Sequence, residues 1–168
     1  MASASIRGEY AGGRIERQQA GAGAQYYQPH HGRWLFYASA SGDVLTHPGP
    51  VDSLLLGGEN GLRGYPLRYQ GGDRRALFTL EERMFTDLYV WRLFRLGAAA
   101  FVDAGRAWGG PFENRRDRGW LADAGVGLRI FNVRSAFSNV LHLDIAFPLD
   151  PGGSVKRVQF LVKTRTSF

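Results

Sequence analysis

The chain of 168 residues contains no cysteine and only two methionines. Without cysteine, a disulfide scaffold, a Cys-ligated zinc site and thiol chemistry are all excluded. Nor is there any apolar run of about 18 residues, which excludes a transmembrane helix. The N-terminal segment MASASIRGEYAGG lacks the apolar region of a secretory signal, so for an exported protein we expect the signal to be missing from this sequence.

Glycine and aromatic residues are plentiful: the chain has 23 Gly, 11 Phe, 7 Tyr and 4 Trp, and 44% of its residues are hydrophobic. This composition argues against disorder and favours many strands joined by turns, within one domain spanning 1–168 or part of a larger one. The net charge of +6 is compatible with anionic lipid, lipopolysaccharide or nucleic acid. Because the basic residues are scattered among aromatics, we predict no nucleic-acid partner.

Apolar and polar residues alternate along most of the chain, which is the period of a β-strand. In the last segment Phe160, Val162 and Phe168 fall on one face, and Gln159 and Lys163 fall on the other. The same alternation predicts further strands at residues 33–41, 75–84, 94–105, 120–130 and 141–147, and less regular ones near 3–10 and 14–27.

The alternation does not by itself say which face meets water. Several segments alternate for ten residues or more, and a tilted strand needs about 9–11 to cross a bilayer. The apolar faces contain small residues such as Ala98 and Ala122, and Trp108, Trp120 and Phe147 lie near strand ends, as in an interfacial girdle. These features favour an outer-membrane β-barrel over a soluble ligand-binding barrel, which remains the alternative.

Residues 54–65, LLLGGENGLRGY, introduce a set of ordered motifs. Leu62, Arg63, Gly64 and Tyr65 match a V/L-R-G-F/Y tetrapeptide. Three motifs follow it: E-x-R at Glu81, F-x-D-x-G from Phe101 through Asp103 to Gly105, and G-x-G-x-R at Gly125, Gly127 and Arg129. Together with the aromatic C-terminal strand, over about residues 53–168, the chain resembles the bacterial surface antigen family of outer-membrane β-barrels, of the BamA, TamA and two-partner-secretion transporter type.

The resemblance implies an all-β fold, an antiparallel transmembrane β-barrel, whose long loop at 57–73 folds into the lumen. Arg63 of that loop would pair with Asp103 and Glu81 on the barrel wall, where a guanidinium suits bidentate contact. The carboxylates Asp103, Asp123 and Asp144 are interleaved with cations, which predicts an ion-paired lumen; these cations are Arg95, Arg129, Lys163 and Arg165.

The length departs from the family pattern, because the chain suffices for about eight strands and family barrels have about sixteen. An eight-strand barrel is only wide enough for side chains, so it would not also hold the loop. We therefore favour the C-terminal half of a larger barrel; two copies forming one barrel, or a small closed barrel with the loop at its mouth, are the alternatives. Glu82 and Arg106 also depart from the pattern, because both fall on the apolar face.

The function implied by the resemblance is insertion or secretion of proteins at the bacterial outer membrane, without enzymatic activity. The alternative is a passive barrel that serves as anchor or pore for another exported domain. The implied partners are outer-membrane lipid and lipopolysaccharide, client polypeptides and, through Phe160, Val162 and Phe168, the outer-membrane assembly machinery. We predict no cofactor and no metal, since His30, His31 and His47 lack further ligands at fixed spacing.

Overall fold

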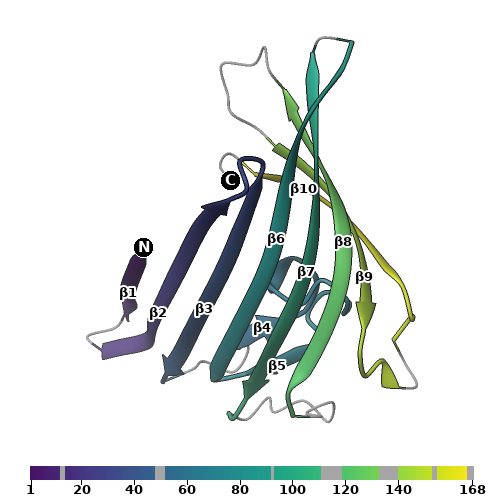
Figure 1. Cartoon of the computed structure of the whole chain (residues 1–168). Helices are drawn as coiled ribbons and strands as arrows, with labels where there is room; N and C mark the ends of the chain where they lie inside the picture. Colours follow the sequence, from purple (N-terminus) through teal and green to yellow (C-terminus); the bar gives the residue numbers. More distant parts are fainter. Residues whose placement is uncertain are drawn as a thin grey trace.

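The computed structural model describes residues 1–11, 14–47, 52–91, 93–110, 119–132, 140–152 and 155–165. Eight of its strands form one antiparallel sheet in the order β1-β2-β3-β6-β7-β8-β9-β10 (Figure 1). Their bounds are Ala2–Ala11, Arg14–His30, Trp34–Thr46, Arg74–Val90, Phe94–Trp108, Leu121–Asn132, Val140–Pro148 and Gln159–Arg165. The prediction of an all-β, antiparallel fold with about eight strands is therefore confirmed.

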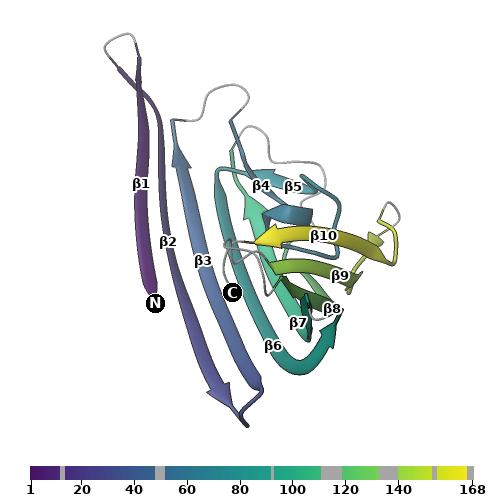
Figure 2. The ribbon, with the colours of Figure 1, turned by 90° about the horizontal axis from the view of Figure 1, so that it is seen from above.

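The sheet is open, and its described strands do not close into a barrel. β1 and β10 are its two edges, and within the described part of the chain neither edge has a second partner strand. Seen from above, β6 to β10 curl into a trough while β1 to β3 continue away from it (Figure 2). Side-chain alternation determines which face of a strand is apolar, but it carries no information about the neighbour of an edge strand.

The predicted division of the two faces is confirmed. Phe160 and Val162 are 76% and 67% exposed on the convex face, whereas Glu81 and Asp103 are buried on the concave face. The strand register explains this, since residues paired across the sheet share a face: Glu81 lies opposite Phe101, and Phe101 lies opposite Gly125. Apolar side chains thus line the outside of the curl, and charged side chains line its inside.

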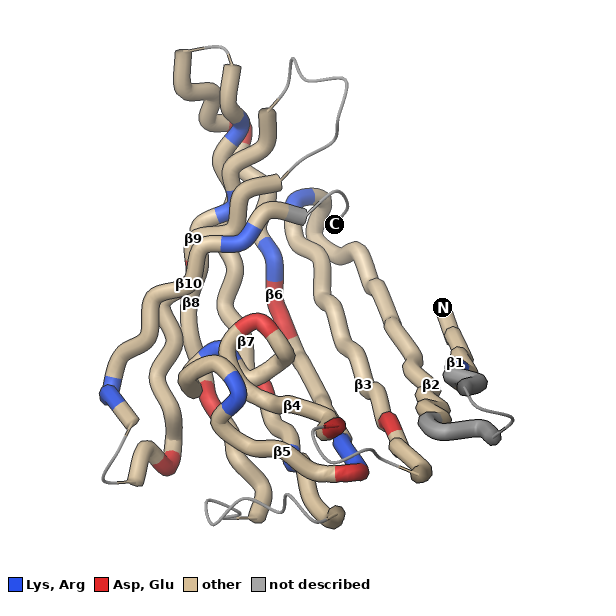
Figure 3. The backbone as a smooth tube through the Cα atoms, turned by 180° about the vertical axis from the view of Figure 1, so that it is seen from behind, with Lys and Arg blue, Asp and Glu red and all other residues tan. Residues whose placement is uncertain are grey.

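The segment expected as a long loop contains regular structure. Residues 57–73, which we call the inner loop, include the 3₁₀-helix η1 (Gly58–Asn60) and β5 (Gln70–Gly72), and β5 pairs with β4 (Leu54–Leu56). The β4–β5 pair lies against the concave side of β6 and β7 (Figure 3). Gly57 and Gly61 have φ of 122° and 126°, a backbone conformation that other residues rarely adopt, and this allows the inner loop to turn tightly.

A small apolar core lies between the inner loop and the concave face. Its buried members are Leu56, Leu62, Tyr65, Tyr69, Ala107, Leu121 and Val155. Because these residues come from the inner loop, β4, β7, β8 and the segment before β10, this core fixes the inner loop against the sheet. No helix in the described part of the chain is long and apolar enough to span a membrane.

Leu62→Ala should lower the free energy of unfolding by roughly 2–5 kcal/mol, since Leu62 is fully buried in this core and its truncation leaves a cavity. Leu67→Ala is the matched control, because Leu67 belongs to the same loop but is 62% exposed, and it should change that free energy by less than about 0.5 kcal/mol. Denaturant titration of both variants measures the difference. Equal losses in the two would contradict the assignment of Leu62 to the core.

Candidate functional site

The four residues of the tetrapeptide serve three different environments. Leu62 and Tyr65 are buried in the apolar core, at 0% and 1% exposure. Arg63 points to the concave face of the sheet, and Gly64 packs against Asp123 of β8. The tetrapeptide is therefore the part of the inner loop that attaches it to the sheet.

Arg63 is held by carboxylates from two strands. Its Nε donates to Asp103 Oδ2 at 2.7 Å and its Nη2 to Asp103 Oδ1 at 3.0 Å, which is a bidentate contact. Its Nη1 donates to Glu81 Oε2 at 2.9 Å. The structure thus brings together the three residues of the expected pairing, and Thr79 adds a hydrogen bond from its hydroxyl to Asp103 Oδ1 at 2.8 Å.

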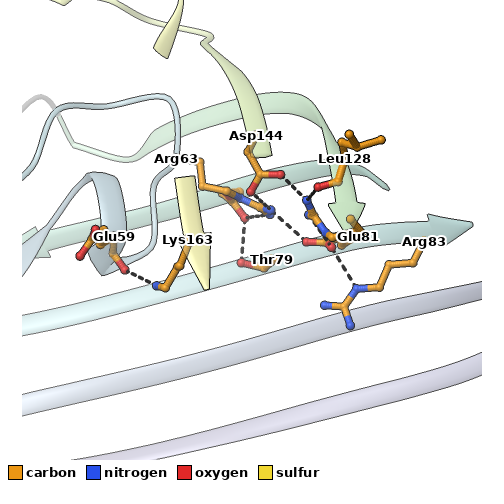
Figure 4. A network of polar contacts seen from close by, with 10 residues as sticks. Glu59, Arg63, Thr79, Glu81, Arg83, Leu128, Asp144 and Lys163 are labelled. Carbon is orange, nitrogen blue, oxygen red and sulfur yellow. Dashed lines mark hydrogen bonds and ion pairs between the residues drawn. The ribbon is translucent and has the colours of Figure 1, made fainter. Parts of the chain in front are cut away.

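Further charged side chains extend this contact into a network (Figure 4). Arg83 Nε donates to Glu81 Oε1 at 2.9 Å, and Arg129 Nη2 donates to the same oxygen at 3.0 Å. Arg129 also pairs with Asp144. We call this set the ionic cluster; its members are Arg63, Glu81, Arg83, Asp103, Arg129 and Asp144.

The cluster keeps Arg63 charged although only 14% of its side chain is exposed. Desolvation by itself would lower the pKa of the Arg63 guanidinium, but the hydrogen bond and charge of Asp103, together with the charges of Glu81 and Asp144, raise it above its ordinary value. Removing one partner from a buried ion pair leaves an uncompensated charge, which is strongly destabilising. We call the contact of Arg63 with Asp103 and Glu81 the lock. It forms only when the inner loop, β6 and β7 are all in place.

Phe101 and Gly125 complete the binding site of the Arg63 guanidinium. The Arg63 Cζ lies 3.3 Å from the centroid of the Phe101 ring, a cation–π contact. A Cβ on Gly125 would overlap the same ring, so glycine at this position leaves the ring its space. Two motifs that lie on neighbouring strands thus shape a single binding surface for Arg63.

The other motif glycines also make room for specific groups. A Cβ on Gly127 would overlap the Asp144 carboxylate and the Arg129 guanidinium, so this glycine accommodates their ion pair. A Cβ on Gly64 would lie 2.5 Å from the Cβ of Asp123. A Cβ on Gly105 would lie 2.9 Å from the carbonyl oxygen of Ala76 and 3.3 Å from the side chains of Leu56 and Leu77. At each of these positions glycine is needed because another group comes close to its Cα, and not because the backbone adopts an unusual conformation.

Tyr65 attaches the inner loop to β8 and to the segment after β9. Its hydroxyl lies 3.2 Å from the carbonyl oxygen of Ala122 and 3.1 Å from that of Asp150. Burial raises the pKa of this hydroxyl, so the phenol stays protonated and can donate its hydrogen bond to these carbonyl oxygens. The phenol therefore connects the inner loop to β8 and to the segment that follows β9.

Along the C-terminal strand β10, apolar side chains on the convex face alternate with side chains that point inward. Phe160 and Val162 lie on the convex face, and Lys163 points inward and donates to the carbonyl oxygen of Glu59 at 3.3 Å. Phe168, the third residue of the expected assembly signal, lies outside the described residues. The edge strand β10 is thus in direct contact with the inner loop.

Three charged residues of the sequence analysis lie away from the cluster. Glu82 is on the apolar face and pairs with His30 at 3.3 Å, and the Arg106 guanidinium lies 5.7 Å from the Trp108 ring. Arg95, which we expected in the ion-paired interior, donates instead to the carbonyl oxygen of Thr86 and lies near Asp87. The ionic cluster is therefore smaller than the alternation of charges along the strands predicted, because Arg95 is not a member of it.

Sequence reasoning missed the participation of Thr79 and Arg83 in the lock, whereas Asp144 is among the residues that the sequence predicts for the ion-paired lumen. Thr79 and Arg83 fall on the polar face in the alternation, and this was the only sequence signal for them. The position of Arg83 within the E-x-R motif gave no indication that it would share Glu81 with Arg129.

A polar hollow of about 410 Å³ adjoins the lock, lined by residues such as Tyr37, Asn60, Thr79, His142 and Lys163. Among the described residues, no group of three or more His, Asp or Glu side chains is placed to hold a metal ion. What the geometry provides is a mechanical attachment of the inner loop to the sheet. No family model and no curated protein matches the chain.

Arg63→Ala should lower the free energy of unfolding by roughly 3–5 kcal/mol, because it leaves Asp103 buried without its cation and removes one of the three arginines that pair with Glu81. Arg33→Ala is the matched control: Arg33 pairs with Asp87 on the surface, where both side chains are more than half exposed, so the loss should stay below about 1 kcal/mol. Denaturant titration measures both variants.

The pairing with Asp103 has its own test. Asp103→Ala should destabilise the chain to a degree comparable with Arg63→Ala, and the double variant should lose less than the sum of the two, because both remove one interaction. Strict additivity would show that Arg63 and Asp103 do not depend on each other.

Proposed function

We propose that this sheet is part of the wall of an outer-membrane β-barrel of the polypeptide assembly and translocation family, acting in insertion or secretion of proteins at the bacterial outer membrane. The observation that carries the proposal is the division of the two faces. In a soluble sheet the apolar face is covered, whereas here the convex apolar face is exposed and the concave ionic face is buried.

The convex face has the chemistry of a lipid-facing surface. Val126, Phe160 and Val162 are between 54% and 76% exposed, and their neighbours on the same face are mostly apolar. Lipid chains would cover this surface without requiring complementary side chains. An area of this kind left in water would be an aggregation site.

Strand length and the position of tryptophan agree with this orientation. β2, β3, β6, β7 and β8 contain 17, 13, 17, 15 and 12 residues, and about 9–11 suffice to cross a bilayer. Trp34 begins β3, Trp91 follows β6 and Trp120 precedes β8, and all three are exposed. Tryptophan at strand ends is typical of the membrane–water interface.

The open edges favour a barrel larger than this sheet. Unpaired backbone groups are costly in lipid, so β1 and β10 each require a partner strand. The inner loop occupies the concave face, and a barrel closed from eight strands has space only for side chains. We therefore favour about sixteen strands, with the additional strands supplied by a further part of the protein.

Assembly or translocation is favoured over the passive anchor or pore by the lock. The inner loop lies across the trough, which suits a braced lumen better than an open channel. Its contacts with the edge strand, through Lys163 and Glu59, would connect the bracing of the lumen to the seam at which a client strand enters. Lipopolysaccharide and the assembly machinery are the further partners that the proposal includes.

Val126→Arg should reduce insertion of the refolded chain into liposomes, because a cation on the lipid-facing side of a strand costs about 2–4 kcal/mol at the bilayer midplane. Leu67→Arg, at an equally exposed apolar position of the inner loop, should leave insertion close to that of the parent. Flotation of liposomes with bound protein measures the inserted fraction. If both variants insert equally well, the convex face is not the lipid-facing one.

Liposomes containing the chain should accelerate the folding of an added unfolded outer-membrane protein relative to empty liposomes, and Arg63→Ala should abolish most of the acceleration. Arg33→Ala is again the control and should retain it, since it affects only a surface ion pair. Protease protection of the client over time measures the rate. If the parent chain inserts but gives no acceleration, the passive anchor or pore replaces the assembly function.

A further inference from the structure

Asp123 is a buried carboxylate that the lock does not use. It is fully buried on β8, and within the described part of the chain neither of its carboxylate oxygens accepts a hydrogen bond of normal geometry. The Gly64 backbone is pressed against it. A buried charge without partners is unfavourable, so the carboxyl group of Asp123 requires an explanation.

A second carboxyl group lies beside it. Asp103 and Asp123 are register partners on β7 and β8, on the same face, and both are fully buried. Because directly opposite residues on one face of an antiparallel pair have their Cβ atoms about 4.5–5.5 Å apart, the two carboxyl groups lie next to each other. Two ionised carboxylates are acceptors only, so no donor lies between them unless one carries a proton.

The neighbouring cations are already engaged. Arg63 is bound to Asp103 and Glu81, and Arg83 and Arg129 are bound to Glu81 and Asp144. These three arginines face four carboxylates when Asp123 is included, which leaves one negative charge in excess. A single proton would balance the charge of the group.

The remaining groups near Asp123 do not supply that balance. The Tyr65 hydroxyl, from the inner loop, is engaged with the carbonyl oxygens of Ala122 and Asp150. His142 lies opposite Arg129, at the other end of the cluster, and Lys163 lies opposite His142. The Asp150 residue is exposed to solvent.

We propose that Asp103 and Asp123 share one proton in the folded chain, so that the Asp123 carboxyl group donates an O–H···O hydrogen bond to Asp103. The proton comes from solvent as the chain folds, and no other bond changes. Asp103 then keeps its bidentate contact with Arg63, and Asp123 sits neutral beneath Gly64. The pair is a proton-binding site at the base of the lock, and it does not depend on the proposed function.

Infrared spectroscopy of the folded full chain tests this directly. The parent should show the carbonyl band of a protonated carboxylic acid at neutral pH, and labelling of aspartate with ¹³C should shift it, which excludes glutamate. Asp123→Asn should lose the band, while its amide N–H takes over the hydrogen bond to Asp103 and keeps the inner loop as resistant to protease as in the parent. Asp144→Asn is the control and should keep the band, since Asp144 is paired with Arg129.

A parent chain without the band at neutral pH overturns the proposal, as does an Asp123→Asn variant that retains it. If Asp123→Asn does not fold, two other variants decide: Asp144→Asn and Asp43→Asn, whose aspartate is paired with Arg75 at 2.7 Å. A ¹³C-aspartate-sensitive band that persists in both variants supports the shared proton. Loss of the band in Asp144→Asn or in Asp43→Asn would assign the proton elsewhere and contradict the proposal.

Discussion

The structure depends on a largely buried guanidinium at the junction of a loop and two strands. Arg63 donates to Glu81 of β6 and to Asp103 of β7, and it rests on the ring of Phe101, which also belongs to β7. A cation with this degree of burial is stable only while its carboxylates surround it. The charge of one loop residue thereby fixes the inner loop, the inner faces of β6 and β7, and through Arg129 and Asp144 the strands β8 and β9.

The two faces of the sheet follow from the same constraint. Charged and small residues occupy the concave face because the lock needs carboxylates and the space that Gly125 and Gly127 provide. The alternation of a strand then places apolar residues on the convex face, where they remain exposed in the isolated sheet. An exposed apolar face is unfavourable in water, and so are two edge strands that have no second partner among the described residues; a lipid bilayer with further strands would relieve both.

Much of the fold could be predicted from the sequence, since a period of two identifies the strands and assigns Phe160 and Glu81 to opposite faces. The tetrapeptide and the motifs that follow it pointed to Arg63, Asp103 and Glu81 as a group, although 40 residues separate the first two. The β4–β5 pair was not predicted, because docking of a loop depends on contacts between distant segments. The unpartnered state of Asp123 likewise emerges only when its neighbours are in place.

The central claim is that Arg63 holds the inner loop against the concave face. Because the chain has no cysteine, spin labels can be attached at introduced cysteines alone, for example at Leu67 in the inner loop and at Val44 on β3. Pulsed electron paramagnetic resonance between these two sites measures the loop position. The account predicts a narrow distribution of distances in the parent chain and a broad one with Arg63→Ala; a distribution that is equally narrow in both would contradict it.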